Sequence, residues 1–262
     1  MDEYLNHALR LTTNYVSTRS IAVVIRDRAG NATTGTSICI EVGSHLLLAT
    51  AGHVIADMND DRLQLIPAGE LSVLPIPFAG RSCSPEQPAP ATDVAWMEVD
   101  RRVARDHRLR FLTLADLKPY QAFDRTHPFL VHGYPHESAI LSPTRADVES
   151  TVGLTMIASP EELPRAVANY EIALEYPPRD EQNRPIATAP AASGFSGGGV
   201  WWSPRHDESM IDSPEQIRLV AINTRWDRRT AILFATKIEY WLHLARQDFP
   251  DTRDGIDRLL QS

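Results

Sequence analysis

The sequence has no long apolar run, and this absence narrows what the chain can be. No stretch approaches the roughly 20 apolar residues that a membrane-spanning helix needs. The first residues, Met1 to Tyr4, are acidic, and no basic segment followed by an apolar one, as in a secretory signal, is visible. We therefore expect a protein that has no membrane contact and works in the cytoplasm.

Cysteine is also scarce. Cys39 and Cys83 are the only two, too few for a disulfide framework. Cys39 stands between Ile38 and Ile40, a position typical of a small buried side chain. Both thiols are expected to be free, which agrees with a reducing compartment.

Basic residues are outnumbered, with 26 Lys and Arg against 34 Asp and Glu and a net charge of −8. Nucleic-acid-binding proteins usually carry an excess of positive charge, so we expect no nucleic-acid partner. Neither a His-Glu-Xaa-Xaa-His motif nor a pair of Cys-Xaa-Xaa-Cys motifs occurs among the nine histidines and two cysteines. A metal hydrolase is therefore a poor interpretation, and we expect no metal and no cofactor.

What the sequence does contain is a serine between glycines, in Gly194-Phe195-Ser196-Gly197-Gly198-Gly199, followed directly by an apolar run. Glycines allow backbone angles that other residues avoid, so such a turn can expose a hydroxyl and direct two backbone N–H groups at one point. Acyl transfer needs this combination of a nucleophile and donors for the oxygen that becomes negative. Taken alone, the stretch is equally compatible with an ordinary glycine-rich turn.

Two upstream residues favour the catalytic interpretation. His53 follows the apolar run Leu46 to Ala49, and Asp93 begins another apolar run, Val94 to Met97. The chain order His, Asp, Ser is that of the chymotrypsin fold and differs from the orders in subtilisin and the α/β-hydrolases.

These stretches resemble the motifs of the chymotrypsin-like (trypsin-like) serine peptidases. Thr50-Ala51-Gly52-His53 is similar to the histidine motif of that family, Asp93-Val94-Ala95 to its aspartate motif, and Gly194-Phe195-Ser196-Gly197-Gly198 to its serine motif. Weaker similarities lie at Gly35-Thr36-Ser37 and Gly133-Tyr134-Pro135. The resemblance implies an all-β fold of two six-stranded antiparallel β-barrels with a C-terminal helix.

The expected organisation follows the chain in order. Residues 1–19 form an N-terminal extension with a short helix, 20–105 the first barrel with His53 and Asp93, 106–236 the second barrel with Ser196, and 237–262 the C-terminal helix and tail. The basic segment from 101 to 110 is expected to link the barrels. His45 is the alternative to His53 as the catalytic histidine, but its place in the predicted hairpin turn at Gly43-Ser44 favours a solvated loop residue. Strands are predicted at 20–25, 35–42, 45–49, 63–65, 71–76, 94–99, 129–133, 151–158, 169–176, 200–202, 217–224 and 231–236.

The resemblance also implies a role for each site residue. Ser196 is the nucleophile, His53 the general base and Asp93 the residue that orients His53, while the N–H groups of Gly194 and Ser196 form the oxyanion hole. Phe195 stands where trypsin-family zymogens hold an acid, so activation by a freed N-terminus is not expected.

By the same resemblance, three further positions would form the substrate pocket. Pro190 lies at its base, and because it is not an acid we expect no preference for Arg or Lys. Trp226 can shorten the pocket, which favours a small or apolar residue at the cleavage site. Thr224 aligns with a family serine whose hydroxyl supports the aspartate.

We therefore predict a serine endopeptidase that acts on a protein or peptide substrate. Because a stand-alone protease must be restrained, a regulatory protein partner or a trigger ligand is a further hypothesis. The alternative is an inactive fold of the same type that serves as a protein-binding module.

Overall fold

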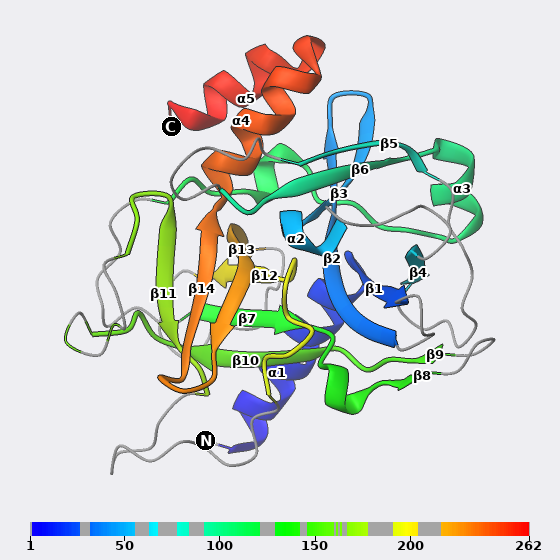
Figure 1. Cartoon of the computed structure of the whole chain (residues 1–262). Helices are drawn as coiled ribbons and strands as arrows, with labels where there is room; N and C mark the ends of the chain where they lie inside the picture. The colour runs from blue at the N-terminus through cyan, green and yellow to red at the C-terminus, as the bar shows by residue number, and fades with distance from the viewer. Residues whose placement is uncertain are drawn as a thin grey trace.

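The chain forms two six-stranded antiparallel sheets. In the computed structural model, drawn in Figure 1, helices lie at both ends of the chain. This confirms the all-β class expected from the resemblance. The structure describes residues 2–26, 32–55, 63–67, 78–83, 92–120, 129–141, 146–159, 161, 163, 167–177, 191–203 and 216–261. The strand expected at 71–76 and residue Pro190 lie outside these ranges.

The first sheet has the strand order β4-β1-β2-β3-β6-β5. Its central strands are apolar on both faces: Ile21 and Val23 of β1 join one hydrophobic cluster, and Ala22 and Val24 join another. Burial on both faces explains why these segments show runs of apolar residues instead of strict alternation. The strands are β1 (Ser20–Arg26), β2 (Ala32–Val42), β3 (His45–Thr50), β4 (Leu63–Pro67), β5 (Phe78–Cys83) and β6 (Ala95–Val99).

The second sheet has the order β10-β7-β12-β13-β14-β11 and provides the serine loop, which leads directly into β12. A separate two-stranded ribbon, β8 with β9, follows β7. The strands are β7 (Phe129–Gly133), β8 (Ile140–Leu141), β9 (Ala146–Asp147), β10 (Thr151–Thr155), β11 (Glu171–Glu175), β12 (Gly199–Trp202), β13 (Arg218–Asp227) and β14 (Ile232–Lys237).

Helices occupy both ends of the chain. The N-terminal helix was expected, and so was the C-terminal helix, but the tail after the latter forms another helix, α5. The basic segment from 101 begins as a helix and not as an irregular linker, because the Asp100 carboxylate accepts the N–H groups of Arg102 and Val103 and so caps it. The helices are α1 (Asp2–Ser17), α2 (Gly52–Ile55), α3 (Arg101–Asp106), α4 (Ile238–Asp248) and α5 (Arg253–Leu260), with short 3-10 turns η2 (Leu114–Asp116), η3 (His136–Ser138) and η7 (Pro250–Thr252).

Two other sequence expectations can be compared with the fold. Cys39 is buried in β2, as predicted, and burial raises the pKa of its thiol. Over the ranges that the structure covers, every helix is too short or too polar to cross a membrane.

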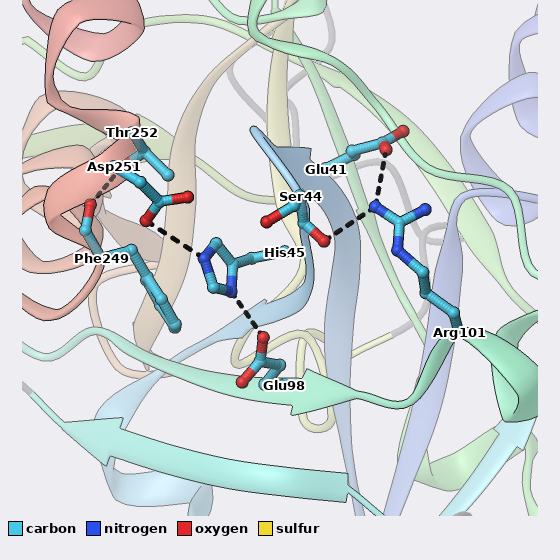
Figure 2. Close-up of polar contacts among 8 residues, drawn as sticks. All are labelled: Glu41, Ser44, His45, Glu98, Arg101, Phe249, Asp251 and Thr252. Carbon is cyan, nitrogen blue, oxygen red and sulfur yellow. Dashed lines mark hydrogen bonds and ion pairs between the residues drawn. The ribbon is translucent and has the colours of Figure 1, made fainter.

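The prediction for His45 is wrong. The hairpin between β2 and β3 forms as expected, but its imidazole packs against Phe249 with ring centroids 4.2 Å apart, and the side chain is only 22% exposed. Nδ1 lies 2.6 Å from a carboxylate oxygen of Glu98, and Nε2 lies 3.2 Å from one of Asp251. Figure 2 shows the ring between these two acids, so His45 joins β3 and β6 to the turn before α5.

The two carboxylates also change how His45 titrates. Burial alone would lower the pKa of its imidazole, but the hydrogen bonds and charges of Glu98 and Asp251 outweigh burial and raise the pKa above its ordinary value of about 6.5. Only the doubly protonated ring can donate to both acids. The contact between the first sheet and the C-terminal helices is therefore strongest when His45 is charged.

Candidate active site

His53 lies in α2, the single helical turn that follows β3. Its backbone N–H donates to Oδ1 of Asp93 (2.8 Å), and its ring atom Nδ1 lies 2.6 Å from Oδ2 of the same carboxylate. An ionised carboxylate only accepts hydrogen bonds, so the ring proton belongs on Nδ1 and the lone pair on Nε2. Because the His53 side chain is 52% exposed, that lone pair is available to a substrate or a nucleophile.

The fold brings His53 and Asp93 together through neighbouring strands. β3 and β6 are paired, with Thr50 opposite Ala95, and His53 and Asp93 lie just beyond the ends of these two strands. Residues 40 positions apart in the sequence thus meet at one edge of the first sheet.

Ser196 sits in a tight loop that only glycine permits on either side. Gly194 has φ +95° and Gly197 has φ +86°, a region that residues with a Cβ rarely adopt. A Cβ on Gly194 would also overlap the carbonyl oxygen of Tyr134, and one on Gly197 would overlap the carbonyl oxygen of Thr36. The glycines around the serine are therefore required by the packing of this loop against both sheets.

Thr36 of β2 ties this loop to the first sheet. Its N–H donates to the carbonyl oxygen of Ser196 (2.8 Å), and its hydroxyl donates to the carbonyl oxygen of Gly194 (2.8 Å). The same hydroxyl accepts the N–H of Tyr134 at 3.1 Å. In the sequence, Thr36 is marked only by a weak similarity to the family. Its role in holding the serine loop is not visible there, because its partners lie about 100 to 160 residues away along the chain.

The peptide between Ser193 and Gly194 is oriented by η3. The carbonyl oxygen of Ser193 accepts the N–H of His136 at 2.8 Å. Because C=O and N–H point in opposite directions in a trans peptide, this bond directs the N–H of Gly194 away from η3. Within the described ranges, neither this N–H nor that of Ser196 donates to a protein acceptor. Both are therefore available to a developing oxyanion.

The Ser196 hydroxyl forms no hydrogen bond with His53 in this structure. Its Oγ donates to the carbonyl oxygen of Thr224 at 3.2 Å. The role expected for the Thr224 side chain is not observed either, because its hydroxyl donates to the carbonyl oxygen of Phe234 (3.2 Å) and not to Asp93. Thr224 lies at an irregularity in the pairing of β13 with β14, between the pairs Asn223–Ala235 and Arg225–Phe234, and this places its hydroxyl at the Phe234 carbonyl.

Aromatic residues pack together on the second-sheet side of the site, and one of them, Trp226, lines it. Phe195 is fully buried and packs against Tyr176, with ring centroids 5.3 Å apart. The serine loop is thus held by apolar packing at the position where trypsin-family zymogens have an acid. Trp226 donates its indole N–H to the carbonyl oxygen of Tyr176 (3.0 Å), which fixes its ring.

His53, Asp93 and Ser196 all line one pocket with a volume of about 710 Å³. Gly194, Thr224 and Trp226 line this pocket as well. In the described part of the chain, no three His, Cys, Asp or Glu side chains gather closely enough to hold a metal ion. The pocket therefore combines an oriented imidazole, a hydroxyl and two unoccupied backbone donors, which are the parts that acyl transfer requires.

Comparisons with known proteins find similarity in structure only. No family model and no curated protein matches the sequence. Among solved structures, an inactivated protease paralogue of the scabies mite has 13% identity and a TM-score of 0.54, over 92% of this chain and 97% of that one. A serine endoprotease from Yersinia pestis has 17% identity and a TM-score of 0.52, over 94% of this chain and 67% of that one.

An HtrA-type protease, AlgW, solved with a tripeptide, has 17% identity and a TM-score of 0.55, over 93% of this chain and 63% of that one. These similarities concern the path of the backbone. The similar structures include proteases and an inactivated protease paralogue. The chain has the fold of the chymotrypsin-like serine peptidases.

Proposed function

We propose that the protein is a serine endopeptidase in which Ser196 attacks a peptide carbonyl. The observation that carries the proposal is the pairing of His53 with Asp93 on the wall of the pocket that also contains Ser196. In the proposed reaction, Nε2 of His53 takes the hydroxyl proton and then returns it to the leaving amine. The N–H groups of Gly194 and Ser196 stabilise the oxyanion, and water hydrolyses the acyl-enzyme.

The hydrogen bond from Ser196 to Thr224 is compatible with this mechanism. A serine hydroxyl moves between staggered rotamers at small cost, and catalytic hydrogen bonds often form only when substrate is bound. The bond also keeps the hydroxyl on the pocket wall. We infer that substrate binding turns the hydroxyl from the Thr224 carbonyl toward His53.

The experiment is hydrolysis of a proteome-derived peptide mixture, analysed by mass spectrometry. The Ser196→Ala variant should lose cleavage by roughly five to six orders of magnitude and remain folded. Ser44→Ala, a change at an exposed turn residue, serves as the matched control and should cleave like the wild type. Equal cleavage by wild type and Ser196→Ala would rule out this nucleophile.

The same pocket supports a second candidate, a module that binds peptides without cleaving them. The contact that favours it is the bond from the Ser196 hydroxyl to the carbonyl oxygen of Thr224, which is formed in place of a bond to the base. A wild-type protein that binds peptides in the mixture but cleaves none would support this candidate.

A further inference from the structure

Arg225 places a positive charge on the wall of the proposed substrate pocket. It lies in β13 between Thr224 and Trp226, lines the pocket and is exposed. Its guanidinium carbon lies 4.3 Å from the ring centroid of Phe234, the residue opposite it on β14. Stacking on a buried aromatic ring restricts a guanidinium and fixes the position of its charge.

This charge has no partner in the described part of the chain, where no carboxylate forms an ion pair with Arg225. The other charged residues that line the pocket, His53 and Asp93, bind each other. A fixed cation that pairs with no carboxylate among the described residues can pair with a carboxylate of a ligand.

The turn that follows β13 adds to the positive character of this region. Arg228 and Arg229 are exposed there, and the carboxylate of Asp227 is used inside the turn, where it accepts the N–H groups of Arg229 and Thr230. The stretch from Arg225 to Thr230 thus carries three arginines and one acid, whereas the whole chain has a net charge of −8. Of these arginines, Arg225 is the one that lines the pocket.

We propose that the pocket selects acidic peptides, with an Asp or Glu of the ligand, within about four residues of the reacting bond, paired to Arg225. This proposal deepens the proposed function and rests on the same pocket, but it concerns recognition and not the chemical step. Arginine suits such a role because its planar guanidinium can bind a carboxylate through two parallel hydrogen bonds while one face stacks on an aromatic ring.

The test measures binding and cleavage with pooled, capped octapeptides in which one position holds Glu, Gln or Lys and the others are mixed. Binding is measured on Ser196→Ala, so it does not depend on catalysis. At the position that meets Arg225, Glu pools should bind about 3- to 10-fold more tightly than Gln pools, and Lys pools more weakly than either. In the active protein, kcat/KM should follow the same order.

The double variant Ser196→Ala, Arg225→Gln should lose the preference for Glu. Arg102→Gln, at an exposed residue of α3, is the matched control and should keep it. Higher salt should reduce the preference, because screening weakens an exposed ion pair. The proposal fails if Glu and Gln pools bind equally at every position, or if the preference survives Arg225→Gln. If Glu pools bind more tightly than Gln pools but the wild-type protein cleaves no peptide, the proposed peptidase activity is refuted and this proposal on recognition stands.

Discussion

Thr36 provides a sharp test of how the serine loop is held. Its side chain is fully buried, and its hydroxyl links the N–H of Tyr134 to the carbonyl oxygen of Gly194. Thr36→Val keeps the shape of the side chain and removes both hydrogen bonds. Thr36→Ser keeps the hydroxyl and removes one methyl group.

The magnitude follows from where the two partners lie. Tyr134 is buried, so its orphaned N–H costs about 1–3 kcal/mol. Gly194 is half-buried, so water can replace the bond to its carbonyl, and only about 1 kcal/mol is lost there. Thr36→Val should therefore lower the free energy of unfolding by about 2–4 kcal/mol. Thr36→Ser should lose about 1 kcal/mol, the cost of one buried methyl group.

Two assays are needed, because loss of stability alone does not show that the loop is affected. Urea unfolding gives the free energies, and reaction with a fluorophosphonate under native conditions gives the reactivity of Ser196. We expect Thr36→Val to react about 5-fold more slowly than the wild type, as the loss of about 1 kcal/mol of loop ordering predicts, and Thr36→Ser to react at nearly the wild-type rate. Equal rates for the two variants would refute the claim that this hydroxyl orders the loop.

Three other predictions concern the contacts of the site and of the C-terminal helices. His136→Pro removes the N–H that donates to the carbonyl oxygen of Ser193, at the first position of η3, where proline is tolerated. The reaction of Ser196 with the phosphonate should then slow about 3- to 10-fold. The control His136→Ala keeps this N–H, and an equal rate for both variants would contradict the role given to η3. Asp93→Asn should lower kcat about 10⁴-fold with little change in stability, through the wrong imidazole tautomer, and a loss below tenfold in a peptide assay would argue against it. Because the pKa of His45 is raised in the folded state, the stabilisation that its ion pairs give is complete below about pH 6.5 and is lost as the pH rises through the folded-state pKa. The difference in unfolding free energy between wild type and His45→Phe should therefore shrink from pH 6 to pH 9. A difference that stays constant with pH would exclude the ionic contact.

The sequence predicts the parts of the site that depend on local motifs. His53, Asp93 and Ser196 follow from three short stretches in a diagnostic order, and the glycines around Ser196 follow from backbone angles that the loop requires. The strands are predicted by their apolar runs because most are buried on at least one face.

The parts that the sequence does not reveal depend on contacts between distant segments. The bond between Thr36 and Gly194 spans 158 residues, and that between His45 and Asp251 spans 206. No periodicity or spacing marks such pairs, so His45 was placed in a solvated turn and Thr224 was assigned a contact with Asp93. The partner of His45 is set by packing of the first sheet against the C-terminal helices, and that of Thr224 by an irregularity in the pairing of β13 with β14.

The most direct test of the account is whether Ser196 is an activated nucleophile that depends on His53. The measurement is the rate of covalent modification by a fluorophosphonate, with the modified residue identified by mass spectrometry of the digested protein. The account predicts one phosphonyl group, located on Ser196, and a rate that falls by at least about a thousandfold in His53→Ala. A wild-type protein that remains unmodified, or one whose rate does not change when His53 is replaced, would contradict it.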